Sequence, residues 1–332
     1  MKPTSQLRNL LPRTDVRRRQ LLTAGLALPV GAALVACGGG GGGGGSSPPP
    51  GGGGGTTLSG RIVAKDSRLW VVDSATGANT NFTATSSTTQ NGVGVSRNGS
   101  IADVWGYDGG NADPWQLTIR SLTGTVTGDY TLTNALLSFP NSAAVLNADA
   151  TRVAYSVNEM TSGTNSTRID RTYVNSLANG NLLAVLDNRA EPAFADGGEL
   201  LVRNGASLHV YNAALVDQGA LSITVEQRAG AYSVSPDGRY IAFEDSSRIR
   251  VLDRNTGSTW YATDASPRGH YAPVFSPDGA YIAFLRAGTL ALRYLHAIPF
   301  SAGVTTTVGD NHAVKSSAGE LYDGTGRIGW AR

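Results

Sequence analysis

From residue 58 onward, apolar and polar residues alternate along the chain in short runs. Two such runs are Leu117–Arg120 and Ile249–Leu252, and Gly, Asn, Asp, Thr or Ser lie between the runs. A period of two is typical of a strand with one buried face, and no stretch of twelve residues follows the 3.6-residue period of a helix. The pattern predicts an all-β domain of short strands and tight turns.

One nine-residue pattern occurs several times in this domain. Ser235–Phe243 reads Ser-Pro-Asp-Gly-Arg-Tyr-Ile-Ala-Phe, and a close copy, Ser276–Phe284, begins 41 residues later. Four weaker copies bring the count to six: Ser96–Gly99, Asn147–Tyr155, Ala195–Val202 and Asp323–Gly324. A repeat of this length indicates a propeller or a solenoid, in which each repeat is one unit of structure.

A second alternating run follows each copy except the last. These runs are Leu117–Arg120, Arg171–Val174, Leu208–Tyr211, Ile249–Leu252 and Leu290–Tyr294, while a sixth, Leu69–Val72, has no copy before it. The last copy thus lacks a following run, and the first run lacks a preceding copy. Together they complete one blade if Val314–Arg332 supplies its two inner strands and Leu58–Thr83 supplies its two outer strands. Residues 57–332 divided among six blades give about 46 residues each, a usual length for propeller blades. We therefore predict a six-bladed β-propeller closed by N- and C-terminal strands.

Two features of the repeats have structural and functional interpretations. Asp237 and Asp278 each lie between Pro and Gly, which is typical of a turn, although a carboxylate could also bind metal or act in catalysis. Aromatic residues at corresponding places, Tyr155, Phe243, Phe284 and Trp330, are expected between blades. We favour the structural interpretation of both, and we predict no metal site, no cofactor and no catalytic residue.

The segment before the domain has the pattern of an export signal. Three arginines, Arg17–Arg19, precede the apolar run Leu21–Ala36, whose 16 residues are too few for a membrane-spanning helix. We predict a signal peptide over residues 1–36. Residues 37–57 follow as Cys37 and a linker, of which Gly38–Gly55 contains only Gly, Ser and Pro. Such a composition predicts a disordered tether, followed by the propeller over residues 58–332.

Leu34-Val35-Ala36-Cys37 resembles the lipobox of bacterial lipoproteins. That resemblance implies cleavage before Cys37 and attachment of a diacylglycerol group to its sulfur. Arg18 and Arg19, followed by Gln20-Leu21-Leu22, also resemble a twin-arginine export motif. An ordinary basic region preceding a general secretory signal remains the alternative.

Composition limits the classes of partner. The formal charge is +2, but residues 1–36 hold six basic groups and one acid, which leaves 21 basic and 24 acidic residues afterwards. A mildly acidic domain gives no electrostatic attraction to nucleic acid. Cys37 is the single cysteine, so an intramolecular disulfide is excluded.

The copies of Ser-Pro-Asp-Gly-x-x-Ile-Ala-Phe resemble the propeller repeats of TolB and its relatives. The resemblance covers roughly residues 60–332 and is strongest over 232–295. TolB-type proteins carry an α/β domain before the propeller, where this chain has a polyglycine linker. A role in the Tol system is therefore in doubt.

Binding surfaces of propellers form where loops lead into the innermost strands and where the second strand connects to the third. Candidate residues in the first kind of segment are Glu191, Arg228, Arg268, His270, Tyr271, Asp310 and His312. Two long connections, Tyr107–Pro114 and Asn158–Arg168, add Asp108, Asp113 and Glu159. Ordinary solvated loops remain the alternative interpretation of these segments.

Together these features favour an envelope-anchored lipoprotein whose propeller is a non-enzymatic binding or scaffold module. The alternative is a surface-anchored glycan hydrolase or lyase with its site at the channel mouth. The expected partners are the membrane, through the lipid, and an envelope protein or glycan. Gly38 stands where an Asp commonly retains lipoproteins at the inner membrane, so the expected location is the periplasmic face of the outer membrane or the cell surface.

Overall fold

The computed structural model describes the part of the chain that holds the predicted propeller. The described residues are 11–12, 58–65, 68–83, 93–105, 115–132, 138–140, 142–160, 168–227, 230–288, 292–316, 319, 321–322, 324 and 326–332. They all belong to one compact unit. In this part of the chain, no helix is long and apolar enough to cross a membrane.

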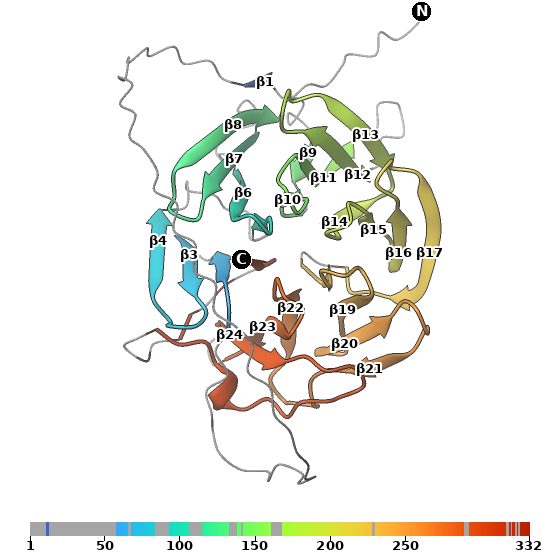
Figure 1. Ribbon diagram of the computed structural model, residues 1–332. Coiled ribbons are helices and arrows are strands. Elements are labelled where there is room, and N and C mark those ends of the chain that lie inside the picture. Colours follow the sequence, from blue (N-terminus) through green and yellow to red (C-terminus); the bar gives the residue numbers. More distant parts are fainter. Residues whose placement is uncertain are drawn as a thin grey trace, which may run out of the picture. The chain divides into compact units, whose positions relative to one another are not determined.

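Six antiparallel sheets, the blades, are arranged around a common centre (Figure 1). Their strands, from the innermost outward, are β25 (Gly329–Ala331), β2 (Arg61–Lys65), β3 (Arg68–Asp73) and β4 (Asn79–Thr83) in blade 1; β5 (Gly94–Val95), β6 (Ser100–Trp105), β7 (Trp115–Ser121) and β8 (Val126–Leu132) in blade 2; β10 (Val145–Leu146), β11 (Arg152–Met160), β12 (Arg168–Ser176) and β13 (Leu182–Asp187) in blade 3; β14 (Ala190–Phe194), β15 (Leu200–Asn204), β16 (Ser207–Tyr211) and β17 (Asp217–Thr224) in blade 4; β18 (Tyr232–Val234), β19 (Tyr240–Asp245), β20 (Arg248–Asp253) and β21 (Thr259–Tyr261) in blade 5; and β22 (His270–Phe275), β23 (Tyr281–Ala287) and β24 (Arg293–Pro299) in blade 6. Two short strands pair outside this scheme, β1 (Leu11–Pro12) with β8 and β9 (Ser138–Pro140) with β11.

The innermost strands form a closed ring. Contacts run from β25 to β5, β10, β14, β18 and β22, and from β22 back to β25. In Figure 1 the C-terminus lies at the centre of this ring. The predicted all-β, six-bladed propeller, closed by N- and C-terminal strands, is confirmed.

The division of strands in the closing blade differs from the prediction. The C-terminal part contributes one strand, β25, rather than two, and three strands come from residues 61–83. Val314 and Tyr322 were expected inside blade 1 but instead bond to Leu295 of blade 6. The N–H of Val314 donates to the Leu295 carbonyl at 2.9 Å, and the N–H of Leu295 donates to the Tyr322 carbonyl at 2.8 Å. Blade 6 has three named strands, and Val314 and Tyr322 bond to the outermost of them, β24.

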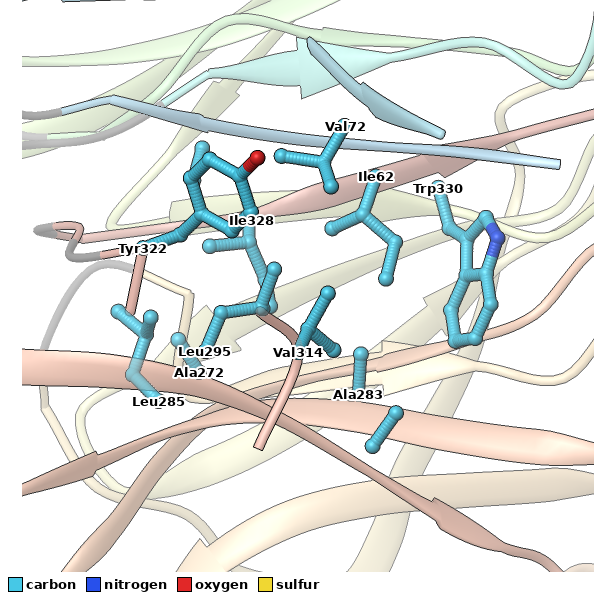
Figure 2. Close-up of a cluster of buried hydrophobic side chains, with 12 residues drawn as sticks. Ile62, Val72, Ala272, Ala283, Leu285, Leu295, Val314, Tyr322, Ile328 and Trp330 are labelled. Carbon is cyan, nitrogen blue, oxygen red and sulfur yellow. The ribbon is translucent and has the colours of Figure 1, made fainter. Parts of the chain in front are cut away.

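The closing blade and blade 6 share an apolar core (Figure 2). Trp330 is 1% exposed and lies with Ile62 and Ile328 against residues of blade 6. Its indole N–H donates to the Ser59 carbonyl at 2.8 Å, and the Tyr322 hydroxyl donates to the Gly77 carbonyl at 2.9 Å. The last strand is therefore fixed by buried apolar surface as well as by the strand ladder.

The Pro-Asp-Gly segments are turns between the innermost and second strands. The Ser235 hydroxyl donates to Asp237 at 2.5 Å and accepts the Tyr240 N–H at 2.8 Å. The copy at Ser276 and Asp278 has the same bonds, and the φ angles of Gly238 and Gly279 are +73° and +72°. These backbone angles favour glycine, which explains its place in the pattern.

The aromatic residues of the repeats pack as expected. Tyr155, Phe243 and Phe284 are buried on second strands and belong to apolar clusters. Trp330 is also buried, but it lies on the innermost strand β25 and pairs with Ile62. Its place in the blade therefore differs from that of the other three.

Candidate functional site

The starts of the innermost strands lie on one face of the propeller, which we call the loop face; the Pro-Asp-Gly turns define the opposite turn face. At Glu191 of blade 4 and Ala272 of blade 6, φ is +54° and +51°. Pro192 or Pro273 comes next, and the strand register shifts at both places. Non-glycine residues seldom adopt positive φ, so each bulge is a local distortion that the surrounding packing must hold.

Glu191 is 2% exposed, and the charges of Arg327 and Arg203 act on its carboxylate. The Tyr232 hydroxyl donates to its carbonyl, and Arg327 donates to the Pro192 carbonyl at 3.0 Å. Burial raises the pKa of the Glu191 carboxyl to about 7, while Arg327, Arg203 and the Gly230 N–H act in the opposite direction. Its Oε2 has no hydrogen-bond partner among the described residues.

Arg327 was not among the predicted site residues. It comes two residues before β25, the position from which the last innermost strand starts, and it is buried. Asp310 and His312, which the sequence predicts in a segment leading into an innermost strand, do not lie at that position. The Arg327–Gly329 segment follows the weakest repeat copy, and only the observed strand pairing identifies it as the start of the closing strand.

At the turn face, Arg97 reaches across the ring. Its Nε lies 3.0 Å from an Asp196 carboxylate oxygen, and its Nη1 donates to the carbonyls of Phe275 and Trp330 at 3.1 and 3.3 Å. These partners belong to blades 4, 6 and 1, while Arg97 belongs to blade 2. Arg97 therefore ties four of the six blades together at one end of the channel.

His270 and Tyr271, predicted as binding residues, are part of the packing. The His270 Nδ1 lies 3.0 Å from the Thr263 hydroxyl, and its ring packs edge-on against Phe284. Burial, followed by the charge of Arg286, lowers the pKa of His270 to about 4. Tyr271 is half-buried, and the guanidinium of Arg293 lies 4.7 Å from the centre of its ring.

Glu159 lies near the loop-face end of a long hairpin formed by β11 and β12. Its two carboxylate oxygens accept bonds from the Tyr173 hydroxyl at 2.5 Å and from Arg171 at 2.7 Å. Arg171 also bonds to Asp187 at 2.6 Å. The two ends of the predicted long connection, Asn158–Met160 and Arg168, are thus strand, since Met160 pairs with Arg168.

Several predicted residues lie outside the described part of the chain. They are Cys37, Arg18, Arg19, Asp108, Asp113 and Arg228. Their roles in lipidation, export and binding therefore stay predictions.

A cavity of about 260 Å³ opens at the loop-face end of blade 6, and we call it the blade 6 cavity. Its charged and ring-bearing lining residues are Arg268, Arg286, Tyr294, His296, Asp310 and Lys315. Two of them, Arg268 and Asp310, were predicted. Arg286 lies 3.3 Å from Asp310, which belongs to the short 3-10 turn η2 (Asp310–His312). His312 accepts the Gly309 N–H through Nδ1 at 3.1 Å, within that turn.

His296 contributes a neutral ring to this cavity. It is 4% exposed, and its Nδ1 lies 3.1 Å from the Tyr294 carbonyl. Burial lowers the pKa of the imidazole to about 4 although that hydrogen bond acts in the opposite direction. Because Nδ1 donates its hydrogen to the carbonyl, Nε2 carries a lone pair, and this atom has no partner among the described residues.

A larger cavity of about 790 Å³ lies between blades 4 and 5. Its charged lining residues are Glu226, Glu244, Asp245 and Arg250. Arg250 and the Tyr261 hydroxyl both bond to Asp245, at 2.8 and 3.1 Å. In the described ranges, no group of three His, Cys, Asp or Glu residues has the arrangement of a metal site.

Comparisons with known proteins bear on the fold. No protein-family model and no curated protein matches the chain. Among solved structures, a protein of unknown function from Bacteroides caccae is 8% identical, with a TM-score of 0.50, and the match covers 82% of this chain and 99% of that one. An Agrobacterium tumefaciens protein described as "putative TolB" is 15% identical, with a TM-score of 0.49, and covers 83% of this chain and 99% of its own. The six-bladed β-propeller that the repeats predicted is the fold of this chain.

Proposed function

We propose that this chain is an envelope-anchored lipoprotein whose propeller is a non-enzymatic binding or scaffold module. The observation that carries the proposal is the blade 6 cavity, which opens on the loop face where binding residues were predicted. It is set on a closed ring of strands, and loops on a rigid scaffold are the usual place for binding residues.

The surroundings of His270 and His312, the two histidines predicted at the loop face, support binding over glycan hydrolysis or cleavage. General acid–base catalysis needs two titratable groups that converge on one reacting point. His270 is buried against Phe284 and Thr263, and His312 is occupied within its own turn. Within the described residues, neither histidine forms an ion pair with a carboxylate.

Membrane attachment is the second part of the proposal and depends on Cys37. An acylated cysteine would hold the propeller at a membrane surface through the linker 38–57, since two or more acyl chains give stable anchoring. The proposed location is the periplasmic face of the outer membrane or the cell surface. There the loop face would meet an envelope protein or glycan.

The test is capture of partners from envelope extracts with the full-length lipidated protein in detergent. Two variants are compared: Arg268→Gln with Lys315→Gln at the cavity, and Gln218→Glu with Leu183→Glu on the outer strands of blades 4 and 3. Both lower the net charge by two at exposed positions. We expect the partner identified with the wild-type protein to be lost with the cavity variant and retained with the control.

If both variants retain the partner equally, the blade 6 cavity is not part of the binding surface. Turnover of an envelope glycan by the purified protein would favour the enzymatic alternative instead. Melting curves of both variants establish that each is folded before capture is compared.

A further inference from the structure

The lining of the blade 6 cavity combines three kinds of contact that one class of small molecule satisfies. Arg268, Arg286 and Lys315 carry positive charge, and Asp310 is the one carboxylate among the lining residues. With His296 neutral, these residues have a formal charge of +2. The Nε of Arg286 has no hydrogen-bond partner among the described residues, although the atom is buried. An anionic group on a ligand would be attracted by this net charge, and it would give the Nε of Arg286 an acceptor in addition to the Asp310 carboxylate near its Nη1, in a site of reduced dielectric.

An anion without a hydrogen-bond donor does not satisfy every group of the site, because the Nε2 of His296 presents a lone pair that needs a donor. Its Nε2 is a buried acceptor without a partner in the described part of the chain, and leaving a buried acceptor unsatisfied destabilises the fold. Sulfate brings only oxygen lone pairs to that atom, and hydrogen phosphate has a single hydroxyl, so neither ion can donate both to Nε2 and to Asp310. A hydroxyl group, by contrast, donates to Nε2, and a second hydroxyl can donate to Asp310.

The size and the remaining lining narrow the class further. A volume of about 260 Å³ corresponds to about nine waters, at about 30 Å³ each, which matches a ligand of monosaccharide size. Tyr294 and Leu321 provide apolar surface on one part of the lining. Sugar rings have a C–H face that packs on such surface, while their hydroxyls remain hydrogen-bonded.

The geometry points to the blade 6 cavity as a binding site for a sugar acid, with its carboxylate on Arg286 and Arg268 and a ring hydroxyl donating to Nε2 of His296. This inference rests on the proposed binding function and names the ligand of its cavity. The sugar acid is either free or the terminal unit of a glycan chain.

The test is titration calorimetry with the full-length protein in detergent. Glucuronate and its methyl glycoside are the probes, and glucose and inorganic phosphate are the comparison ligands. We expect glucuronate or its glycoside to bind with a roughly millimolar dissociation constant, and glucose and phosphate to bind at least tenfold more weakly. If glucuronate binds more tightly than its methyl glycoside, the ligand is a free sugar acid. If the glycoside binds as tightly as glucuronate, the ligand is the terminal sugar acid of a glycan.

Matched variants separate recognition from packing. Arg286→Gln and His296→Phe should each weaken glucuronate binding at least tenfold. Two control variants should leave glucuronate binding unchanged: Arg293→Gln, next to Tyr294 on the same strand, and His270→Phe, in the same sheet. Neither Arg293 nor His270 lines the cavity. Arg268→Gln, at an exposed position, provides a variant whose folding is not at risk.

The inference is overturned if neither glucuronate nor its glycoside binds, if glucose or phosphate binds equally well, or if His270→Phe weakens binding as much as His296→Phe. Capture of an envelope partner does not depend on this titration. A failed titration with successful capture would therefore remove the sugar acid and leave the binding function in place.

Discussion

Three buried ionisable side chains, Glu191, His270 and His296, lie towards the loop face of the propeller. Burial acts on all of them by favouring the uncharged form, which raises the pKa of the carboxyl and lowers the pKa of the imidazoles. The pH dependence of folding that follows has opposite signs for the two residue types. Stability contributed by Glu191 is lost as the pH rises, and stability at the histidines is lost as the pH falls.

Replacing Glu191 by Gln should abolish the loss of stability that occurs as the pH rises from 4.5 through 7. The folded pKa of about 7 lies above the ordinary 4.5, so the protonated form stabilises the fold fully below pH 4.5, and this contribution disappears as the pH rises through 7. The shift corresponds to about 3 kcal/mol. Urea unfolding at pH 5 and pH 8 should show the stability of E191Q rising, relative to the wild type, by an amount of this order. A constant difference between the two proteins would contradict the burial of an ionisable carboxyl.

Replacing His270 by Phe should reduce sensitivity to acid. The folded pKa of about 4 lies below the ordinary 6.5, so stability is lost progressively as the pH falls from 6.5 to 4. Phe retains the contact with Phe284 and cannot be protonated. Between pH 7 and pH 4.5, H270F should lose up to about 3 kcal/mol less unfolding free energy than the wild type. Parallel pH profiles of the two proteins in urea unfolding would be evidence against this origin of acid sensitivity.

At the scale of elements, the two Pro-Asp-Gly turns have the same local bonds but different neighbours. Asp278 also accepts a hydrogen bond from Ser59, 3.2 Å away in the segment that leads into β2, whereas the bonds of Asp237 lie within its own turn. The turn of blade 6 therefore also contacts the closing blade.

Asp237→Ala and Asp278→Ala form a matched pair for this difference. Each removes the side-chain acceptor of a turn and should cost about 1 kcal/mol. The Asp278 variant should cost a few tenths of a kcal/mol more, because it also leaves Ser59 without its partner. Chemical denaturation of both proteins measures the two costs. A larger cost at Asp237 would show that the contact with Ser59 adds no stability.

The sequence predicts these elements well where the repeat is strong and less well near the chain ends. Ser235–Phe243 and Ser276–Phe284 carry turn residues and alternating apolar positions that agree, so turn and strand follow from local chemistry. Val314 and Tyr322 lie in a segment without such a pattern, and the sequence does not show that they bond to Leu295 of blade 6 rather than enter blade 1. The site residues Arg327 and His296 could not be recognised from the sequence. Arg327 is placed at the start of the closing strand only by the pairing of β25 with β2, and His296 is distinguished only by its buried Nε2, which has no partner among the described residues.

For the whole molecule, closure of the ring of blades depends on the three residues of the short strand β25 and on the contacts around them. β25 pairs with β2, Trp330 is buried against blade 6, and Arg97 and Arg327 hold the same segment at the two ends of the channel. Loss of a buried Trp costs about 3–5 kcal/mol, while the net stability of a domain is about 5–15 kcal/mol.

Deleting residues 324–332 should therefore open or unfold the propeller, although terminal residues are usually dispensable. An equally long deletion in the linker, Gly38–Ser46, is the control and should leave the melting temperature unchanged. The melting curves of the two full chains, each with one deletion, are compared. A 324–332 deletion that melts like the control would mean that β25 does not hold the ring closed.

Membrane attachment is also a property of the whole molecule. Cys37→Ser should give a protein that is unlipidated, soluble or unprocessed, because the proposed acyl chains have no other sulfur to join. Carbonate washing of membranes followed by immunoblotting measures the fraction that remains bound. If the variant remains in washed membranes to the same extent as the wild type, attachment does not depend on Cys37.

The pairing of β25 with β2 has a consequence for biosynthesis. The two strands are about 270 residues apart, so at about 5–20 residues per second the ribosome makes β25 roughly 15 to 50 seconds after β2. During that interval the first blade to be synthesised presents an unpaired strand edge, which can pair with other chains. The nascent protein therefore needs either a chaperone on that edge or a translation rate fast enough to limit aggregation.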